Sequence, residues 1–142
     1  MPVDDDARDR AERIERADYH ARALQRREQE EAAQAQLLID AFVAEALARD
    51  LPTVELAAKP WSGSGHYRTG RTGWYLKRDQ SLAVGVDGGY YVLVVAPQRL
   101  ARWRGVAVEP SPPPLQVGKG ARDGESITLK ELLALRLDWP PA

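Results

Sequence analysis

The stretch AAQAQLLIDAFVAEALARDLPTVEL, residues 32–56, contains the point at which the chain changes from helical to strand periodicity. Its first part carries a wide apolar stripe that includes Leu38 and Phe42, as expected of a helix that lies against a core. Pro52 ends this pattern, because the residue before a proline is disfavoured in the helical region. Residues 53–56 then alternate polar and apolar side chains, as a half-buried strand does. We therefore predict a helix over residues 32–51 that covers a β-sheet.

The chain before this stretch also has a helix-forming composition, but its surface is far more charged. No glycine or proline occurs from Val3 to Leu51, and residue types that favour helices dominate this part. Residues 4–31 contain ten acids and seven arginines, whereas residues 32–49 contain two acids and one arginine. We predict one long helix in which residues 1–31 form a charged projecting segment, while residues 32–142 form a single α+β domain.

A narrow apolar seam runs along this charged segment. Its members, spaced by three, four and three residues, are Ile14, Ala17, Ala21 and Leu24. This is the spacing of a coiled-coil heptad, but the next two positions of the seam are Glu28 and Glu31. Facing carboxylates repel each other, so the pattern favours weak or heterotypic pairing. The segment is interpreted either as a solvated helix or as the contact with a protein partner or a second copy of the chain.

The segment from about residue 53 to residue 108 is predicted to form an antiparallel meander. Asp87-Gly88 is a strong hairpin signal, and Tyr90–Val95 is apolar on both faces, as a central strand is. Four glycines in residues 61–73 indicate a loop or an irregular hairpin. The predicted strands are residues 53–56, 74–77, 82–86, 90–95 and 106–108, and residues 97–103 are expected to include a helical turn.

The C-terminal part is predicted to complete the core. The proline-rich arm, residues 110–114, is expected to be extended. The glycine-rich residues 118–126 lack the order of glycine, lysine and serine that a phosphate-binding P-loop requires, so a surface loop is expected there. Thr128 and Glu131 fit a capping box, which predicts a short helix over about residues 129–137. The fold class is α+β: a long N-terminal helix packed by its second half on a small, mostly antiparallel sheet, with a short C-terminal helix.

The composition of the whole chain excludes several classes of protein. Its 142 residues correspond to one domain, and a net charge of −1 argues against a globally basic nucleic-acid binder. The absence of cysteine excludes disulfides and thiolate metal sites. The acidic start lacks the apolar region of a signal peptide and no long apolar stretch is present, so we expect a cytoplasmic protein without a membrane segment. The excess of arginine over lysine indicates a GC-rich bacterial genome.

One segment, residues 59–78, combines cations and aromatic rings without any acid. Such a combination is typical of surfaces that bind single-stranded nucleic acid, where cations contact phosphates and rings stack on bases. The candidate phosphate contacts are Arg68, Arg71, Lys77 and Arg78, and the candidate stacking faces are Trp61, Tyr67 and Trp74. The alternative is that these aromatic rings belong to the core of the sheet and the cations solvate its rim.

The sequence offers no set of residues with the spacing of a catalytic centre. His66 has serines nearby, but catalysis needs a base that is oriented by a third group. His20 lies within the charged helix and is expected to be solvated. We therefore predict no catalytic, cofactor-binding or metal-binding residues. The sequence favours a non-enzymatic interaction or adaptor protein that binds its partner through the N-terminal helix, with an RNA or single-strand DNA binding module as the first alternative and an enzyme as the second.

Overall fold

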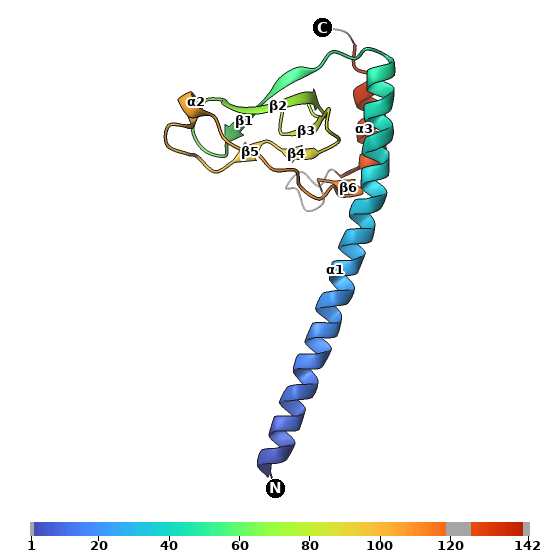
Figure 1. The fold of residues 1–142 in the computed structure, drawn as a ribbon, viewed down its shortest axis with the longest axis vertical. Coiled ribbons are helices and arrows are strands. Elements are labelled where there is room, and N and C mark those ends of the chain that lie inside the picture. The colour runs from blue at the N-terminus through green and yellow to red at the C-terminus, as the bar shows by residue number, and fades with distance from the viewer. Residues whose placement is uncertain (1, 119–125, 141–142) are drawn as a thin grey trace.

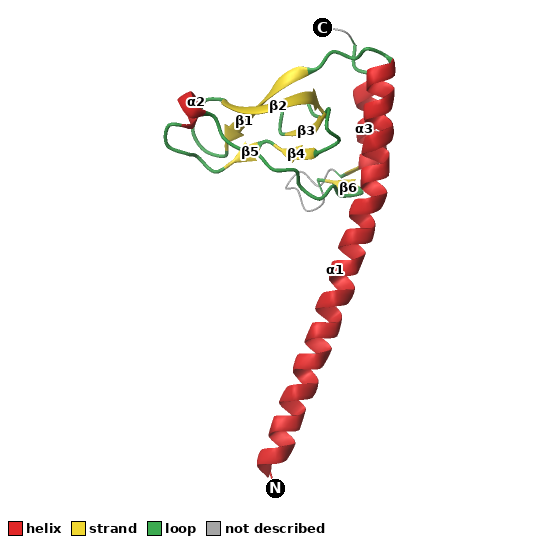
Figure 2. Ribbon diagram, viewed as in Figure 1, coloured by secondary structure: helices red, strands yellow, loops and turns green. Residues whose placement is uncertain are grey.

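The computed structural model describes residues 2–118 and 126–140, and it confirms the predicted α+β class. Helix α1 (Pro2–Ala48) extends far beyond the rest of the molecule, whereas its C-terminal half lies against a small sheet and helix α3 (Figures 1 and 2). The other elements are β1 (Val54–Pro60), β2 (Tyr67–Tyr75), β3 (Leu82–Gly85), β4 (Tyr90–Val92), β5 (Val94–Val95), α2 (Ala101–Arg104), β6 (Gln116–Val117), β7 (Ile127–Thr128) and α3 (Leu129–Leu137).

The main sheet curls back on itself. Its strand order is β4-β3-β2-β1-β5, with antiparallel neighbours except for the parallel pair β1 and β5. Strands β4 and β5 therefore occupy opposite edges, although only Leu93 separates them. The Leu93 N–H donates to the Ser81 carbonyl at 2.8 Å, and the Leu93 carbonyl accepts from the Lys59 N–H at 2.8 Å. The predicted central strand over residues 90–95 was wrong: this segment breaks at Leu93 and joins the two edges.

One of the other predicted strands is longer than expected, and one is absent. Residues 61–66 form the loop of the predicted irregular hairpin, whereas residues 67–73 belong to β2, which pairs with β1 through a register shift at Leu56 and Ala57. A Cβ atom on Gly73 would clash with the Val84 carbonyl oxygen of the neighbouring strand, so glycine is needed for this close approach of the backbones. The predicted strand over residues 106–108 was also wrong. The Val106 N–H bonds to the Arg68 carbonyl at 2.8 Å, but no ladder forms, and Val106 and Val108 instead fill the inside of the curled sheet.

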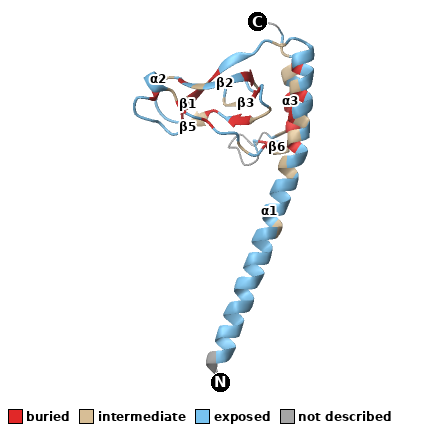
Figure 3. Cartoon of the chain, in the orientation of Figure 1, coloured by how far each residue is buried: buried red, intermediate tan, exposed pale blue. Residues whose placement is uncertain are grey.

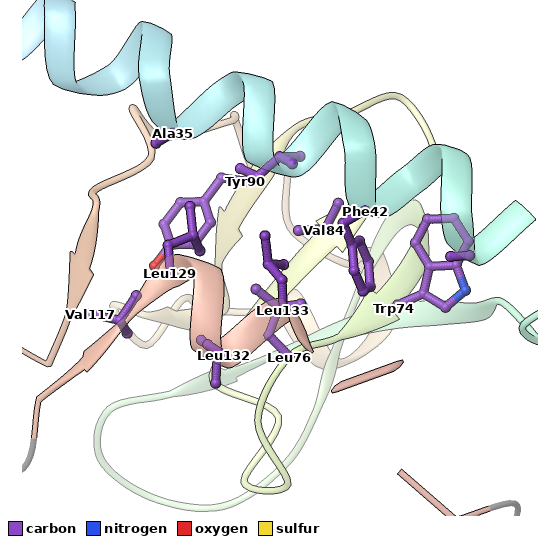
Figure 4. Packing of buried hydrophobic residues seen from close by; sticks show 12 residues of the cluster. Ala35, Phe42, Trp74, Leu76, Val84, Tyr90, Val117, Leu129, Leu132 and Leu133 are labelled. Carbon is purple, nitrogen blue, oxygen red and sulfur yellow. The ribbon is translucent and has the colours of Figure 1, made fainter. Parts of the chain in front are cut away.

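The molecule has two apolar cores, one on each face of the sheet. The first joins the buried face of α1 and α3 to the outer face of the sheet (Figure 4); it includes Ile39, Phe42, Trp74, Leu129 and Leu133. The second lies inside the curled sheet and is closed by α2 and residues 106–108; it includes Leu56, Tyr67, Tyr91, Leu93 and Ala101. We call residues 53–118 and 126–140 the body, and residues 4–30 of α1 the free part of the helix. The first core fixes α1 to the body and thereby determines the direction in which the free part points.

The C-terminal end of α1 is locked by both backbone and side-chain contacts. Asp50 adopts a left-handed conformation with φ 52°, and the N–H groups of Leu51 and Asp50 bond to the Ala46 and Leu47 carbonyls at 2.9 and 3.1 Å. This is a Schellman motif, which confirms the predicted stop before Pro52. The Trp74 indole N–H donates to the Leu51 carbonyl at 3.1 Å, so the core of the sheet also holds the end of the helix.

The C-terminal segment follows the sequence prediction where the structure describes it. The Thr128 hydroxyl accepts from the Glu131 N–H at 3.1 Å, and α3 covers the predicted residues 129–137. In the proline-rich arm, the Ser111 N–H donates to the Tyr90 carbonyl at 2.8 Å and Pro113 is buried, so the arm packs on the body. Most of the predicted glycine-rich loop, residues 119–125, lies outside the described residues.

Candidate interaction surfaces

The free part of α1 is the most exposed region of the described chain. Every described side chain from Asp4 to Glu30 is exposed except the half-buried Ala23 (Figure 3). Ile14 is 59% exposed and Leu24 is 56% exposed. At 1.5 Å per residue, this free part is about 40 Å long. The sequence-predicted partner contacts therefore lie together on a surface that the body does not cover.

The seam lies on the face of α1 that binds the body farther along. Steps of seven residues connect Ile14, Ala21, Glu28, Ala35 and Phe42. The last two are buried in the first core, whereas Ile14 is exposed. We call the residues Ile14, Ala17, Ala21 and Leu24 the exposed seam. It continues the buried face of the same helix beyond the edge of the body.

Along α1, the contact with the body begins at Glu31. The Glu31 carboxylate accepts from the Leu115 N–H at 3.1 Å, and Glu31 is half-buried. One turn farther on, the Gln36 amide donates to the Gly88 carbonyl at 2.8 Å and to the Asp40 carboxylate at 2.9 Å. Glu31 thus has a partner within the chain, and of the two acids that interrupt the seam, Glu28 alone lies on the exposed part of the helix.

The arginines of the free helix bond to the backbone. Arg13, Arg16 and Arg22 each donate their Nε–H to the carbonyl oxygen four residues earlier, at 3.3–3.4 Å. Each of these arginines follows an acid by four residues, which is the spacing of helical ion pairs, but the contact is made to the backbone of the acidic residue. On the opposite face of the helix, Tyr19 is exposed and lies edge-on to His20 at 5.8 Å. The surface of this free helix is therefore charged, apart from one apolar seam.

Two of the predicted nucleic-acid contacts are core residues. Trp74 is fully buried and packs edge-on against Phe42, with ring centroids 5.7 Å apart. Tyr67 is buried in the second core. A buried ring offers no face to a base, so the prediction that these two residues stack on nucleic acid is corrected. The cause is the alternation of β2, which turns these rings toward opposite faces of the sheet.

The predicted phosphate contacts are mostly engaged by neighbours outside the acid-free segment. Lys77 pairs with the Asp79 carboxylate at 3.8 Å, and Arg71 pairs with the Asp87 carboxylate at 3.4 Å. Arg78 lies over the Trp139 ring at 4.9 Å, and Arg136 lies over the same ring at 4.3 Å. Residues 59–78 contain no acid in sequence, but in space two acids and an indole ring approach their cations.

The Arg71 contact belongs to a compact polar cluster. Arg71 also donates to the Val108 carbonyl at 3.1 Å and lies over the Tyr91 ring at 5.2 Å. The Tyr91 hydroxyl donates to the Asp87 carboxylate at 2.7 Å. Burial and this hydrogen bond raise the pKa of Tyr91 to about 12. Partial burial raises the pKa of Asp87, but hydrogen bonding and the charge of Arg71 outweigh it, so the net shift is downward. This cluster stabilises the turn after β3.

A different basic and aromatic surface lies at the end of the sheet that carries α2. Trp61 is 71% exposed and Trp103 is 68% exposed. Arg68 donates to the Trp103 carbonyl at 2.9 Å, and the Arg102 guanidinium lies beside Gly65 of the loop that contains Trp61. We call the residues Trp61, Arg68, Arg102 and Trp103 the α2 patch. Of these four residues, only Trp61 and Arg68 were predicted from the sequence, although residues 98–104 contain three arginines and a tryptophan without an acid.

His66 is exposed in the loop between β1 and β2, and among the described residues no group of three or more potential metal ligands comes together. Within residues 2–118 and 126–140, no helix has both the length and the apolarity needed to cross a bilayer. Comparison of the chain with protein-family models, with curated proteins and with solved structures found no match.

Proposed function

We propose that this chain is a non-enzymatic interaction protein that binds a helical protein partner through the exposed seam of α1. The observation that carries the proposal is the continuity of one helix face, which the body covers from Ala35 onward and leaves uncovered at Ile14 and Leu24. Heptad-spaced apolar residues on a solvated helix gain free energy when a second helix covers them. The charged faces on either side keep the free helix solvated and restrict the contact to the seam.

Site-specific photo-cross-linking in cells tests this function. A photoreactive amino acid replaces Ile14 or Leu24 in the full chain, and the matched control replaces Tyr19, an equally exposed residue on the opposite face of the same helix. We expect a discrete protein adduct from positions 14 and 24 and much less adduct from position 19. Equal yields at all three positions, or no adduct at positions 14 and 24, would overturn the proposal. The mass of the adduct identifies the partner.

A second candidate function is single-strand nucleic-acid binding at the α2 patch. It is supported by two exposed tryptophan rings next to Arg68 and Arg102 on one end of the molecule. This end lies far from the acidic N-terminal helix segment (Figure 1), which reduces the repulsion that its acids would exert on phosphates. If about two phosphates are neutralised, the logarithm of the affinity should fall with the logarithm of salt at a slope near −1.4.

Titration of labelled single-stranded RNA and DNA at low salt tests this candidate. Trp103→Ala should cost about 1–3 kcal/mol of binding free energy if a base stacks on the ring. Tyr19→Ala is the matched control, because it removes an exposed ring from the acidic helix. The candidate is excluded if neither nucleic acid binds, or if the two substitutions weaken binding equally.

A further inference from the structure

We infer that the partner helix of the exposed seam is the same segment of a second copy of this chain, bound antiparallel with Ile14 of each copy opposite Leu24 of the other. The inference rests on the proposed function, because it names the partner of that same seam. In this register Ala17 of one copy faces Ala21 of the other. Each apolar residue of the exposed seam thus meets an apolar residue, and the seam is complementary to its own reverse.

The position of the body fixes the antiparallel direction. The body packs on the same face of α1 that carries the exposed seam, and it begins at Glu31, which accepts from the Leu115 N–H. In a parallel pair, each body would occupy the space between the two helices beyond residue 31, and the two bodies would collide. In the antiparallel pair, the free helix of the second copy runs along the exposed seam, and its residue 7 lies opposite Glu31, at the edge of the body. Because α1 begins at Pro2, the free helix is about one turn longer than the uncovered face, and its first turn must fray in the dimer.

The charges within the seam agree with this direction. Arg10 lies one heptad step before Ala17, and Glu28 lies one step after Ala21. The antiparallel register places Arg10 of one copy opposite Glu28 of the other at both ends of the apolar layers. In a parallel register, Glu28 would face Glu28 and Arg10 would face Arg10, which is destabilising. The acid that interrupts the seam in the sequence is thus matched by a cation of the second copy.

The contact is expected to be weak and dependent on concentration. Its central layers consist of alanine, which buries little apolar area compared with leucine. The positions that flank the layers oppose the contact, because Arg13 lies beside Arg27 of the second copy and Asp18 lies beside Asp18. A reversible dimer, dissociated on dilution, follows from this balance.

Sedimentation equilibrium of the full-length chain over a wide concentration range tests the inference. Arg10→Glu and Glu28→Arg should each weaken the dimer about tenfold or more, because each creates like-charge contacts at both ends. The double variant R10E/E28R should restore the dimer to within about threefold of wild type. Both positions are exposed in the monomer, so the circular dichroism of dilute samples should not change. Failure of the double variant to recover, or a chain that is monomeric at every concentration, would overturn the inference.

Engineered disulfides test the register independently, because the natural chain contains no cysteine. A mixture of Ala17→Cys and Ala21→Cys chains should form the mixed disulfide faster than either homodimeric disulfide. Preferential linkage of position 17 to position 17 would show parallel pairing and contradict the inference. If the purified chain stays monomeric while positions 14 and 24 still cross-link to a foreign protein in cells, the proposed function stands and the inference fails. If neither experiment shows a contact at the seam, both fail.

Discussion

The two halves of α1 belong to one uninterrupted helix, yet different interactions maintain them. In the packed half, Phe42 is buried against Trp74, and the backbone end is closed by a Schellman motif. In the free half, Ile14 occupies the same heptad position but remains 59% exposed, and arginines bond to backbone carbonyls along its surface. The comparison shows one helix face that the body covers in one half and leaves uncovered in the other, and the external contact in the second half is our proposal.

The largest expected difference between the two halves is in the free energy of unfolding that is lost when the same heptad position is truncated in each. Phe42→Ala should lower the free energy of unfolding by about 3–5 kcal/mol, because it leaves a cavity in the first core. Ile14→Ala should lower it by less than about 1 kcal/mol in dilute protein, where the free half is monomeric. Urea unfolding at low protein concentration measures both. Similar losses at the two positions would remove the distinction between a packed and a free half.

A subtler change should affect only the packed half. Trp74→Phe keeps an aromatic ring against Phe42 but removes the indole N–H that bonds to the Leu51 carbonyl. The loss should be about 1–3 kcal/mol, because a buried acceptor loses its partner and the smaller ring leaves a gap. Hydrogen exchange should show faster opening at the C-terminal end of α1. An unchanged exchange rate there would mean that this hydrogen bond does not hold the helix end.

Alkaline pH should lower the free energy of unfolding of the body, but it should not act directly on the free half of α1. The folded-state pKa of Tyr91 is raised to about 12, whereas an ordinary tyrosine has a pKa of 10.0. Between these values the unfolded chain loses the Tyr91 proton first, so the contribution of this group to stability falls as pH rises from about 10 to about 12. Tyr91→Phe has no proton to lose and should show a smaller decline over this range. Equal declines in thermal midpoint for both chains would contradict the role assigned to the Asp87 contact.

The smallest expected effect lies at the junction of the two halves. Glu31→Ala removes the acceptor for the Leu115 N–H and should cost about 0.5–1.5 kcal/mol. Glu31→Gln keeps an acceptor oxygen and should recover part of this loss, whereas Glu30→Ala, at the exposed neighbouring position, should change stability by less than about 0.5 kcal/mol. Thermal unfolding of the three variants checks the order. If Glu30→Ala costs as much as Glu31→Ala, the body does not begin at Glu31.

Sequence reasoning succeeded where the decisive signal is local. The helix stop at Asp50 and Pro52 and the N-cap at Thr128 each depend on a few adjacent residues, and both are present in the structure. The exposure of Ile14 and Leu24 followed from the change in charge density along one helix. These features could be predicted because no distant part of the chain decides them.

Features that depend on distant pairing could not be predicted in this way. Closure of the sheet at Leu93 requires hydrogen bonds to Ser81, immediately before β3, and to Lys59 of β1, which lie far apart in the sequence. The acid-free window ended at Arg78, immediately before Asp79, so counting charges along the sequence missed the ion pairs that neutralise it. The prediction of the α2 patch was incomplete for a related reason. Trp103 and Arg102 are distant from Trp61 in the sequence, and only the fold brings them close to it.

Hydrogen–deuterium exchange along α1 at several protein concentrations tests the central claim most directly. We expect the amides of residues 35–48 to be protected at every concentration, because the body covers their face. The amides of residues 10–28 should exchange quickly in dilute protein and become protected as concentration rises and the exposed seam is covered. Protection of residues 10–28 that does not change with concentration would contradict the claim that one face of α1 serves an internal contact in one half and an external contact in the other.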